Sequence, residues 1–142
     1  MIAPRKLSKS SEFEAEGLAW NEFINFCATE EPEDMSKNQQ TAHAVFWYMS
    51  EVAKYGHTYF LLNADAPKIE RTLHALKDIG DENCIANLLQ IISLVSTYEE
   101  SNPDESIKHI DQQFLDKYEA GLLAQLKSFF EANESEFIEW IK

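Results

Sequence analysis

The four histidines are the side chains of this sequence best suited to binding a metal. They stand at His43, His57, His74 and His109, and Glu70 with His74 has the i, i+4 spacing that aims two side chains from one helix face. Helical zinc sites of the protease type need a second histidine one turn from the first with a glutamate between them, and the sequence lacks that pattern. We therefore expect surface or capping histidines, no metal and no cofactor.

Motifs for enzymatic catalysis are also missing from the sequence. The four glycines are isolated, and there is neither a serine nucleophile elbow nor a Cys-x-x-Cys pair. Acid–base catalysis needs a carboxylate in a desolvated cleft, and none of the 25 acids can be singled out for that role. Cys27 and Cys84 fall inside apolar helical patterns, which favours buried thiols. We expect a protein that is not an enzyme.

Carboxylates dominate the charge of the chain, which is formally −13. The segment from Ser11 to Ser36 carries eight acids and no base, and the segment from Glu99 to Lys142 carries eleven acids and four bases. Carboxylates one helical turn apart are separated by about 5–6 Å at Cβ, which is of the order of the phosphate spacing along a DNA strand. The predicted partner-binding surface comprises Glu12, Glu14, Glu16, Glu99, Glu100, Asp104, Glu105, Asp111, Asp116 and Glu119.

An ordinary solvated helix face accounts for the same spacing, because like charges one turn apart cost only about 0.2–0.5 kcal/mol. Direct binding of nucleic acid is disfavoured, since affinity for phosphates comes from lysine and arginine. A basic protein partner is favoured instead. The sequence contains no apolar run long enough to span a bilayer and no signal-peptide pattern, so we expect a cytoplasmic protein.

Helical punctuation and apolar periodicity predict a single compact multi-helix domain of the all-α class over residues 11–142, preceded by a basic tail at residues 1–10. Capping-box spacing occurs at Ser11, Ser36 and Asn133, and Asn102 and Asp65 precede a proline as N-caps do. The predicted helices are Glu12–Thr29, Lys37–Tyr55, Thr58–Asn63, Ala66–Ile79, Glu82–Thr97, Pro103–Ala132 with a break near Asp111, and Glu134–Ile141.

Gly56 and Gly80 stand just after periodic segments and are predicted to close helices. The run of large side chains Phe46–Met49 covers most of a helix circumference, which indicates a helix that is either central or partly covered by another subunit, and the central position is favoured. The predicted core comprises Phe46, Met49, Leu73, Leu76, Leu88, Leu89, Leu122, Leu126 and Phe129.

A series of residues in the middle of the chain resembles the DMP19-like family in order and spacing: Val45–Val52, Gly56-His57, Tyr59-Phe60, Asn63, Ala75-Leu76 and Ile79-Gly80. The run Phe114–Phe137 is also similar, and the resemblance covers about Thr41 to Ile141. The chain departs from the family at the turn Ala53–Gly56, which has one glycine and no asparagine, and at Thr58, where the family tends to have glutamine.

The founding member of that family is described as a DNA-mimic protein. The resemblance therefore implies an all-helical fold able to form homodimers, and imitation of DNA charge to occupy a basic DNA-binding protein such as a transcription regulator. Fold-level analogy is weak support for function, so a second hypothesis stays open. In it, the chain is a helical protein-interaction module whose acidity is incidental.

Overall fold

The computed structural model describes residues 1–8, 12–96 and 104–141, without the side chains of residues 12–14. The all-α fold class is confirmed, with helices α1 (Glu12–Thr29), α2 (Lys37–Tyr55), α3 (His57–Leu62), α4 (Ala66–Ile79), α5 (Glu82–Ser96), α6 (Asp104–Gln113) and α7 (Glu119–Ala132). The shorter elements are strand β1 (Arg5–Ser8), 3-10 turns η1 (Pro32–Asp34) and η3 (Glu134–Glu136), the π-helical segment η2 (Phe114–Tyr118), and strand β2 (Ile138–Ile141).

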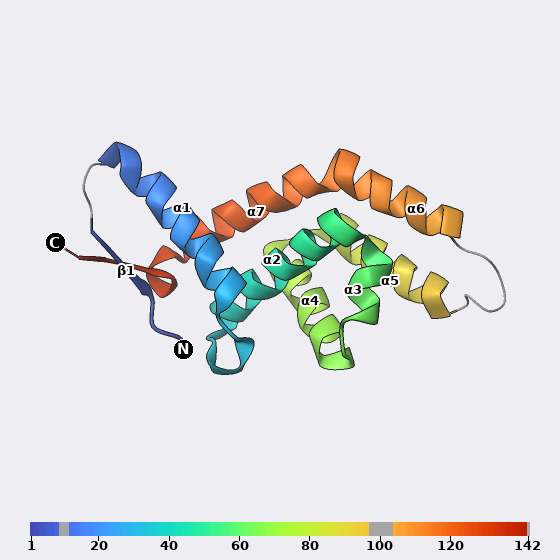
Figure 1. Ribbon diagram of the computed structural model, residues 1–142, viewed down its shortest axis with the longest axis horizontal. Coiled ribbons are helices and arrows are strands. Elements are labelled where there is room, and N and C mark those ends of the chain that lie inside the picture. The colour runs from blue at the N-terminus through green and yellow to red at the C-terminus, as the bar shows by residue number, and fades with distance from the viewer. Residues whose placement is uncertain (9–11, 97–103, 142) are drawn as a thin grey trace.

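Helix α2 is the central element of the molecule, as the run of large side chains predicted. It packs against α1, α3, α4 and α7, and Figure 1 shows it lying beneath the long rod formed by α6, η2 and α7. Tyr48 is fully buried at its centre, and Phe114 of η2 stacks on the Tyr48 ring with centroids 5.9 Å apart. The expected break near Asp111 is present as η2, a local widening of the rod rather than an interruption.

The predicted helix ends at α2 and α4 are confirmed in atomic detail. Ser36 and Gln39 form a capping box at the start of α2, and the Asp65 side chain accepts a hydrogen bond from the Lys68 backbone N–H at the start of α4. Gly56 and Gly80 follow α2 and α4 with positive φ angles, a backbone conformation that glycine adopts without a Cβ penalty. The predicted starts at Ser11 and Asn102 lie outside the described residues.

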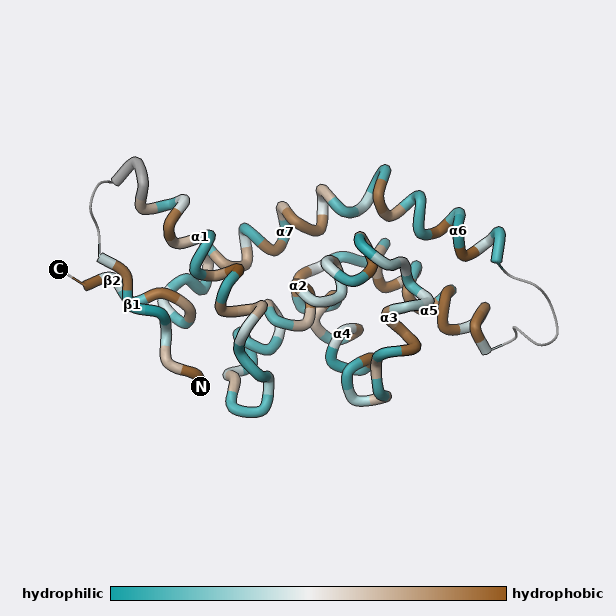
Figure 2. Tube along the Cα trace, viewed as in Figure 1, coloured by the Kyte–Doolittle hydropathy of each residue, from teal (hydrophilic) through white to brown (hydrophobic). Residues whose placement is uncertain are grey.

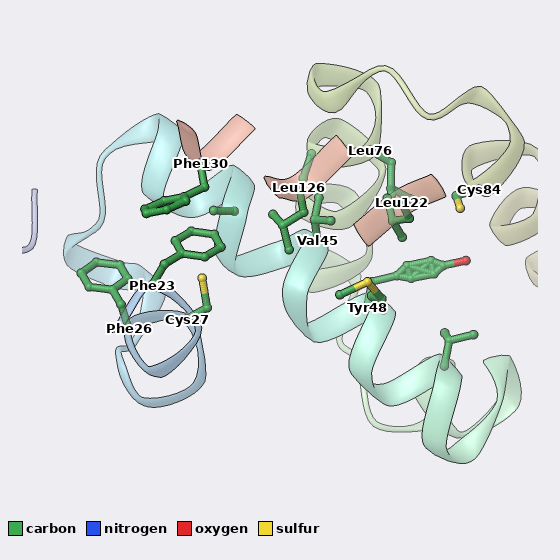
Figure 3. Packing of buried hydrophobic residues seen from close by; sticks show 14 of the residues in the cluster. Phe23, Phe26, Cys27, Val45, Tyr48, Leu76, Cys84, Leu122, Leu126 and Phe130 are labelled. Carbon is green, nitrogen blue, oxygen red and sulfur yellow. The ribbon is translucent and has the colours of Figure 1, made fainter. Parts of the chain in front are cut away.

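The core runs along the interior face of α2 and confirms most of the predicted set. Figure 3 shows Leu76, Leu122 and Leu126 gathered around Val45 and Tyr48, while aromatic rings from α1 and α7 form the other end of the cluster. The prediction for Leu89 is wrong, because its side chain is 51% exposed. Helix α5 has apolar residues at exposed as well as buried positions, and Figure 2 shows brown residues along it, so periodicity alone does not identify its buried side.

The C-terminal segment is a strand, and the helix predicted over Glu134–Ile141 is wrong. Residues 138–141 pair in parallel with residues 5–8, in the register Arg5 with Ile138 and Ser8 with Ile141 (Figure 1). The Asn133 side chain does not cap a helix there, and instead its backbone carbonyl accepts from Glu136 N–H in a single 3-10 turn. The β-branched Ile138 and Ile141 suit a strand, but the partner strand lies at the other end of the sequence.

Gln39 of α2 forms hydrogen bonds with segments near both ends of the chain. Its fully buried amide accepts from the backbone N–H of Ile2 (3.0 Å) and of Ser36 (2.9 Å), and donates to the carbonyls of Ile2 (2.7 Å) and Glu136 (2.8 Å). Arg5 adds an ion pair with Glu30 at 2.7 Å. A buried amide whose four hydrogen bonds are all satisfied holds its partners, Ile2, Ser36 and Glu136, in one geometry. Part of the predicted basic tail is therefore packed against the helical domain.

Candidate functional site

Asp111, one of the ten predicted surface acids, belongs to a hydrogen-bonded network inside the molecule. Its Oδ1 lies 2.6 Å from His57 Nδ1 and 3.0 Å from the His57 backbone nitrogen, which donates to it. The other ring nitrogen, Nε2, lies 2.7 Å from the Tyr48 hydroxyl. His57 is fully buried, so the expectation of a surface or capping histidine is wrong for this residue.

The hydrogen-bond directions in this network follow from the chemistry of its members. Burial raises the pKa of Tyr48 well above its ordinary value, and electrostatic interactions with Cys84, Asp81 and Asp111 raise it further. The Tyr48 hydroxyl therefore keeps its proton. The Asp111 carboxylate can only accept, so Nδ1–H of His57 donates to it, and in this tautomer Nε2 accepts from the Tyr48 hydroxyl. The network connects α2, α3 and α6, and it gives Asp111 a structural role.

Gly56 makes room for this carboxylate. Its φ angle is +88°, and a Cβ placed on it would lie 2.7 Å from Asp111 Oδ2, closer than side chains tolerate. The Gly56-His57 pair quoted above for its resemblance to the family thus has a physical role. The glycine allows Asp111 to approach, and the following histidine supplies both hydrogen-bond donors.

The other predicted surface acids fall into three groups. Glu16, Asp104, Glu105 and Asp116 are exposed, and Glu119 is half-buried. Glu99 and Glu100, together with the side chains of Glu12 and Glu14, lie outside the described residues.

Glu16 of the first predicted acidic block and Asp104 of the second lie towards opposite ends of the molecule. In Figure 1, α1 stands at one end of the view and the start of α6 at the other. Trp20, one turn beyond Glu16 in α1, packs on Phe130 of α7 with ring centroids 6.0 Å apart. Phe130 is 26 positions along the rod from Asp104. At 1.5 Å per residue the blocks are separated by about 40 Å, comparable with the roughly 34–36 Å of one DNA turn.

Lysines interrupt the acids on the rod between these blocks. Lys108, Lys117 and Lys127 are all exposed there, and Lys108 lies 4.0 Å from Glu105 in an ion pair whose two partners are both solvent-exposed. The rod therefore does not present an unbroken row of negative charge. The acidic surface of the described residues consists of separate groups of carboxylates.

A third acidic group, which the predicted site omitted, lies in the connection between α1 and α2. We call it the acidic connection and define it as Glu30, Glu31, Glu33 and Asp34. Glu30 is paired with Arg5, and the other three are exposed. Helix α1 ends at Thr29, so Glu30 and Glu31 stand at the negative end of its dipole, a placement that costs about 0.3–1 kcal/mol per exposed carboxylate.

The sequence did contain a signal for the acidic connection. Its four carboxylates occur within five positions and belong to the base-free segment from Ser11 to Ser36. Glu12 and Glu16 in the same segment have helical spacing, whereas a loop has no period that would single out its carboxylates.

The acidic connection forms one side of a groove of about 350 Å³ along α2. Helix α4 provides the opposite side with Lys68, Arg71 and Thr72, and the remaining lining residues are Ala28, Glu30, Glu31, Pro32, Glu33, His43, Ala44, Trp47 and Glu51. A second groove of about 300 Å³ continues along α4 and contains Glu70 and His74, the pair considered above as ligands. Both of these side chains are exposed.

No three His, Cys, Asp or Glu side chains among the described residues come together as a metal site would require. Within the same residues, no helix combines the length and the apolar character needed to cross a bilayer. Cys27 and Cys84 are buried and unpaired, as predicted, and burial raises the pKa of both thiols.

Comparison with known proteins gives one match. Neither curated proteins nor solved structures match the sequence. The model of a family described as DMP19-like protein matches residues 33–142, a span that includes Tyr48, His57 and Asp111. This span is well over half of the chain, and the chain therefore belongs to the DMP19-like family.

Proposed function

We propose that this chain is an acidic binding protein without catalytic activity that occupies the DNA-binding surface of a basic partner, such as a transcription regulator. The observation that carries the proposal is the excess of exposed carboxylates over nearby cations. Most carboxylates of the described residues are exposed, and the Lys or Arg ion pairs between described residues are those of Glu30, Glu51 and Glu105. Membership of a family whose founding member is described as a DNA mimic supports the same proposal.

Electrostatics make a basic partner the best fit to this surface. A net charge of −13 on a chain of 142 residues creates a negative potential that attracts cationic surfaces and accelerates their association at low salt. Separate carboxylate groups about 40 Å apart can contact a basic surface that normally follows one turn of a duplex. Glu31 adds support, because an exposed acid without an ion pair among the described residues at a helix C-terminus does not serve the stability of that helix.

A second candidate function is a helical interaction module whose acidity is incidental, and one feature favours it. Tyr55 at the end of α2 and Tyr59 and Leu62 on α3 are exposed, with exposed fractions of 52%, 40% and 76%. The two tyrosine rings are in contact, with centroids 4.2 Å apart and their planes tilted by 33°. Exposed tyrosine side chains of this kind are typical anchors of protein interfaces. A partner held by this strip would bind with little dependence on salt.

Affinity capture with the immobilised chain from a native cytosolic extract separates the two functions. The proposed function predicts that basic DNA-binding proteins are retained at low salt, released at high salt, and eluted by duplex DNA. Charge screening beyond about 8 Å at physiological ionic strength is the reason for the salt effect. Retention that survives high salt, is insensitive to DNA and is lost in a Tyr59→Ser, Leu62→Ser variant would instead establish the interaction module.

A further inference from the structure

We propose that the groove along α2 binds a small zwitterion, specifically an amino acid with an apolar side chain. The inference rests on the arrangement of charge and apolar surface around the groove and not on the proposed partner. A volume of about 350 Å³ falls within the range of about 300–1,000 Å³ typical of small-molecule sites.

The two sides of the groove carry opposite charge. On the α4 side, Lys68 is neutralised by Glu51, whose Oε1 lies 3.0 Å from the Lys68 Nζ. Arg71 on the same side is exposed and has no carboxylate within 4.0 Å among the described residues. A guanidinium in this position offers a two-pronged set of donors that matches a carboxylate.

The acidic connection supplies the negative side. Glu30 is satisfied by Arg5, while Glu31 and Glu33 are exposed and have no lysine or arginine within 4.0 Å in the part of the chain that the structure describes. Two unneutralised carboxylates can accept hydrogen bonds from an ammonium group.

Charged residues from both sides of the groove affect the pKa of His43. Burial is the main cause that lowers the pKa of His43, and a hydrogen bond with the Glu30 backbone opposes it. The positive charges of Arg71 and Lys68 lower this pKa further, whereas the negative charge of Glu33 raises it. Cations from α4 and a carboxylate from the acidic connection therefore act electrostatically on one imidazole ring, and all four side chains line the same groove.

Trp47 provides the apolar base of the groove. Its Nε1–H donates to the Cys27 carbonyl at 2.9 Å, which holds the half-buried indole in place, and Pro32, Ala28 and Ala44 line the groove beside it. A fixed indole offers a large apolar contact area. The ligand's carboxylate would face Arg71, its ammonium group would face Glu31 and Glu33, and its side chain would lie on Trp47.

The test is an NMR titration of the full-length protein that follows the indole N–H signals of its three tryptophans. The ligands are L-phenylalanine and L-leucine, with 3-phenylpropanoate, which lacks the ammonium group, and 2-phenylethylamine, which lacks the carboxylate. We expect saturable shifts of the Trp47 signal with both amino acids below about 10 mM, and small shifts of Trp20 and Trp140, which do not line the groove. Each ligand that lacks one charge should bind about tenfold more weakly than L-phenylalanine.

Matched variants test the positive side and the negative side of the groove separately. Arg71→Gln should weaken L-phenylalanine binding by about tenfold, whereas Lys77→Gln, the same charge change on α4 away from the groove, should not. Glu33→Gln should weaken it as well, with Asp34→Asn in the same turn as the control. The inference is overturned if neither amino acid shifts Trp47, if a ligand with one charge binds as tightly as L-phenylalanine, or if each control variant loses as much affinity as its partner.

Discussion

The Asp111 carboxylate accepts two hydrogen bonds from one residue, the first from the His57 backbone N–H and the second from its ring. At the scale of single residues, this arrangement gives a charged side chain in an acidic segment a structural role, although 28% of it is exposed. The sequence placed Asp111 correctly on a helix but gave no sign that His57, 54 positions away, would lie against it. Contacts between remote positions depend on how helices pack, which periodicity does not specify.

Removal of the Asp111 carboxylate should destabilise the protein more than removal of a neighbouring exposed acid. In Asp111→Ala the buried Nδ1–H of His57 loses its acceptor, which costs about 1–3 kcal/mol of unfolding free energy. Asp116→Ala, at an exposed position on the same rod, should change stability by less than about 0.5 kcal/mol. Urea unfolding of both variants measures the difference. Equal stabilities would show that the network contributes nothing.

His43 should make folding stability depend on pH below neutrality. Burial lowers its pKa below the ordinary 6.5, so the unfolded chain binds a proton more readily than the folded protein. The His43 contribution to stability is therefore at its maximum above pH 6.5 and decreases as pH falls through 6.5 towards the lower folded pKa. Unfolding free energies at several pH values should fall less steeply for His43→Gln than for the unaltered protein. Identical slopes would contradict the assignment.

At the scale of elements, the sequence predicted most helices because each carries its own signals. The capping box at Ser36, the proline after Asp65 and the glycines after α2 and α4 all act within a few residues, so local chemistry determines these ends. Strand β2 could not be predicted in the same way. Its pairing with residues 5–8 and its attachment through Gln39 involve segments about 100 or more positions apart.

Replacement of Gly56 by alanine should be more destabilising than the same change at Gly80. Both glycines have φ angles near +87°, but Gly56 has a ψ angle of 169°, a combination almost restricted to glycine, whereas Gly80 is in the left-handed helical region. A Cβ at Gly56 would also collide with Asp111, and nothing lies within 4 Å of one at Gly80.

We expect a strain of about 1–2 kcal/mol in Gly80→Ala and a clearly larger loss in Gly56→Ala, measured by thermal or urea unfolding. Addition of Asp111→Ala to Gly56→Ala should recover part of that loss by removing the collision. A double variant as unstable as the sum of the two single changes would refute this explanation.

At the scale of the whole molecule, the sequence determines the net charge but does not predict where the charged side chains lie on the surface. The net charge of −13 and the base-free segment are direct counts, but their distribution over the surface depends on the fold. Glu16 and Asp104 lie far apart, and exposed lysines lie among the acids of the rod. The acidic connection is a third group of carboxylates. The acidic surface is thus a set of carboxylate groups spaced along an elongated molecule.

Competition between this chain and duplex DNA for a captured basic partner tests the central claim most directly. Labelled duplex bound to the partner is titrated with the unaltered chain, with a variant in which Glu99, Glu100, Asp104 and Glu105 are changed to lysine, and with one in which Glu12, Glu14 and Glu16 are changed to lysine. We expect the unaltered chain to displace the DNA, less effectively as salt rises. At least one charge-reversed variant should fail to displace it while its unfolding free energy changes by no more than about 0.5 kcal/mol per substitution. Full displacement by both variants, or simultaneous binding of chain and duplex to the partner, would contradict the proposed function.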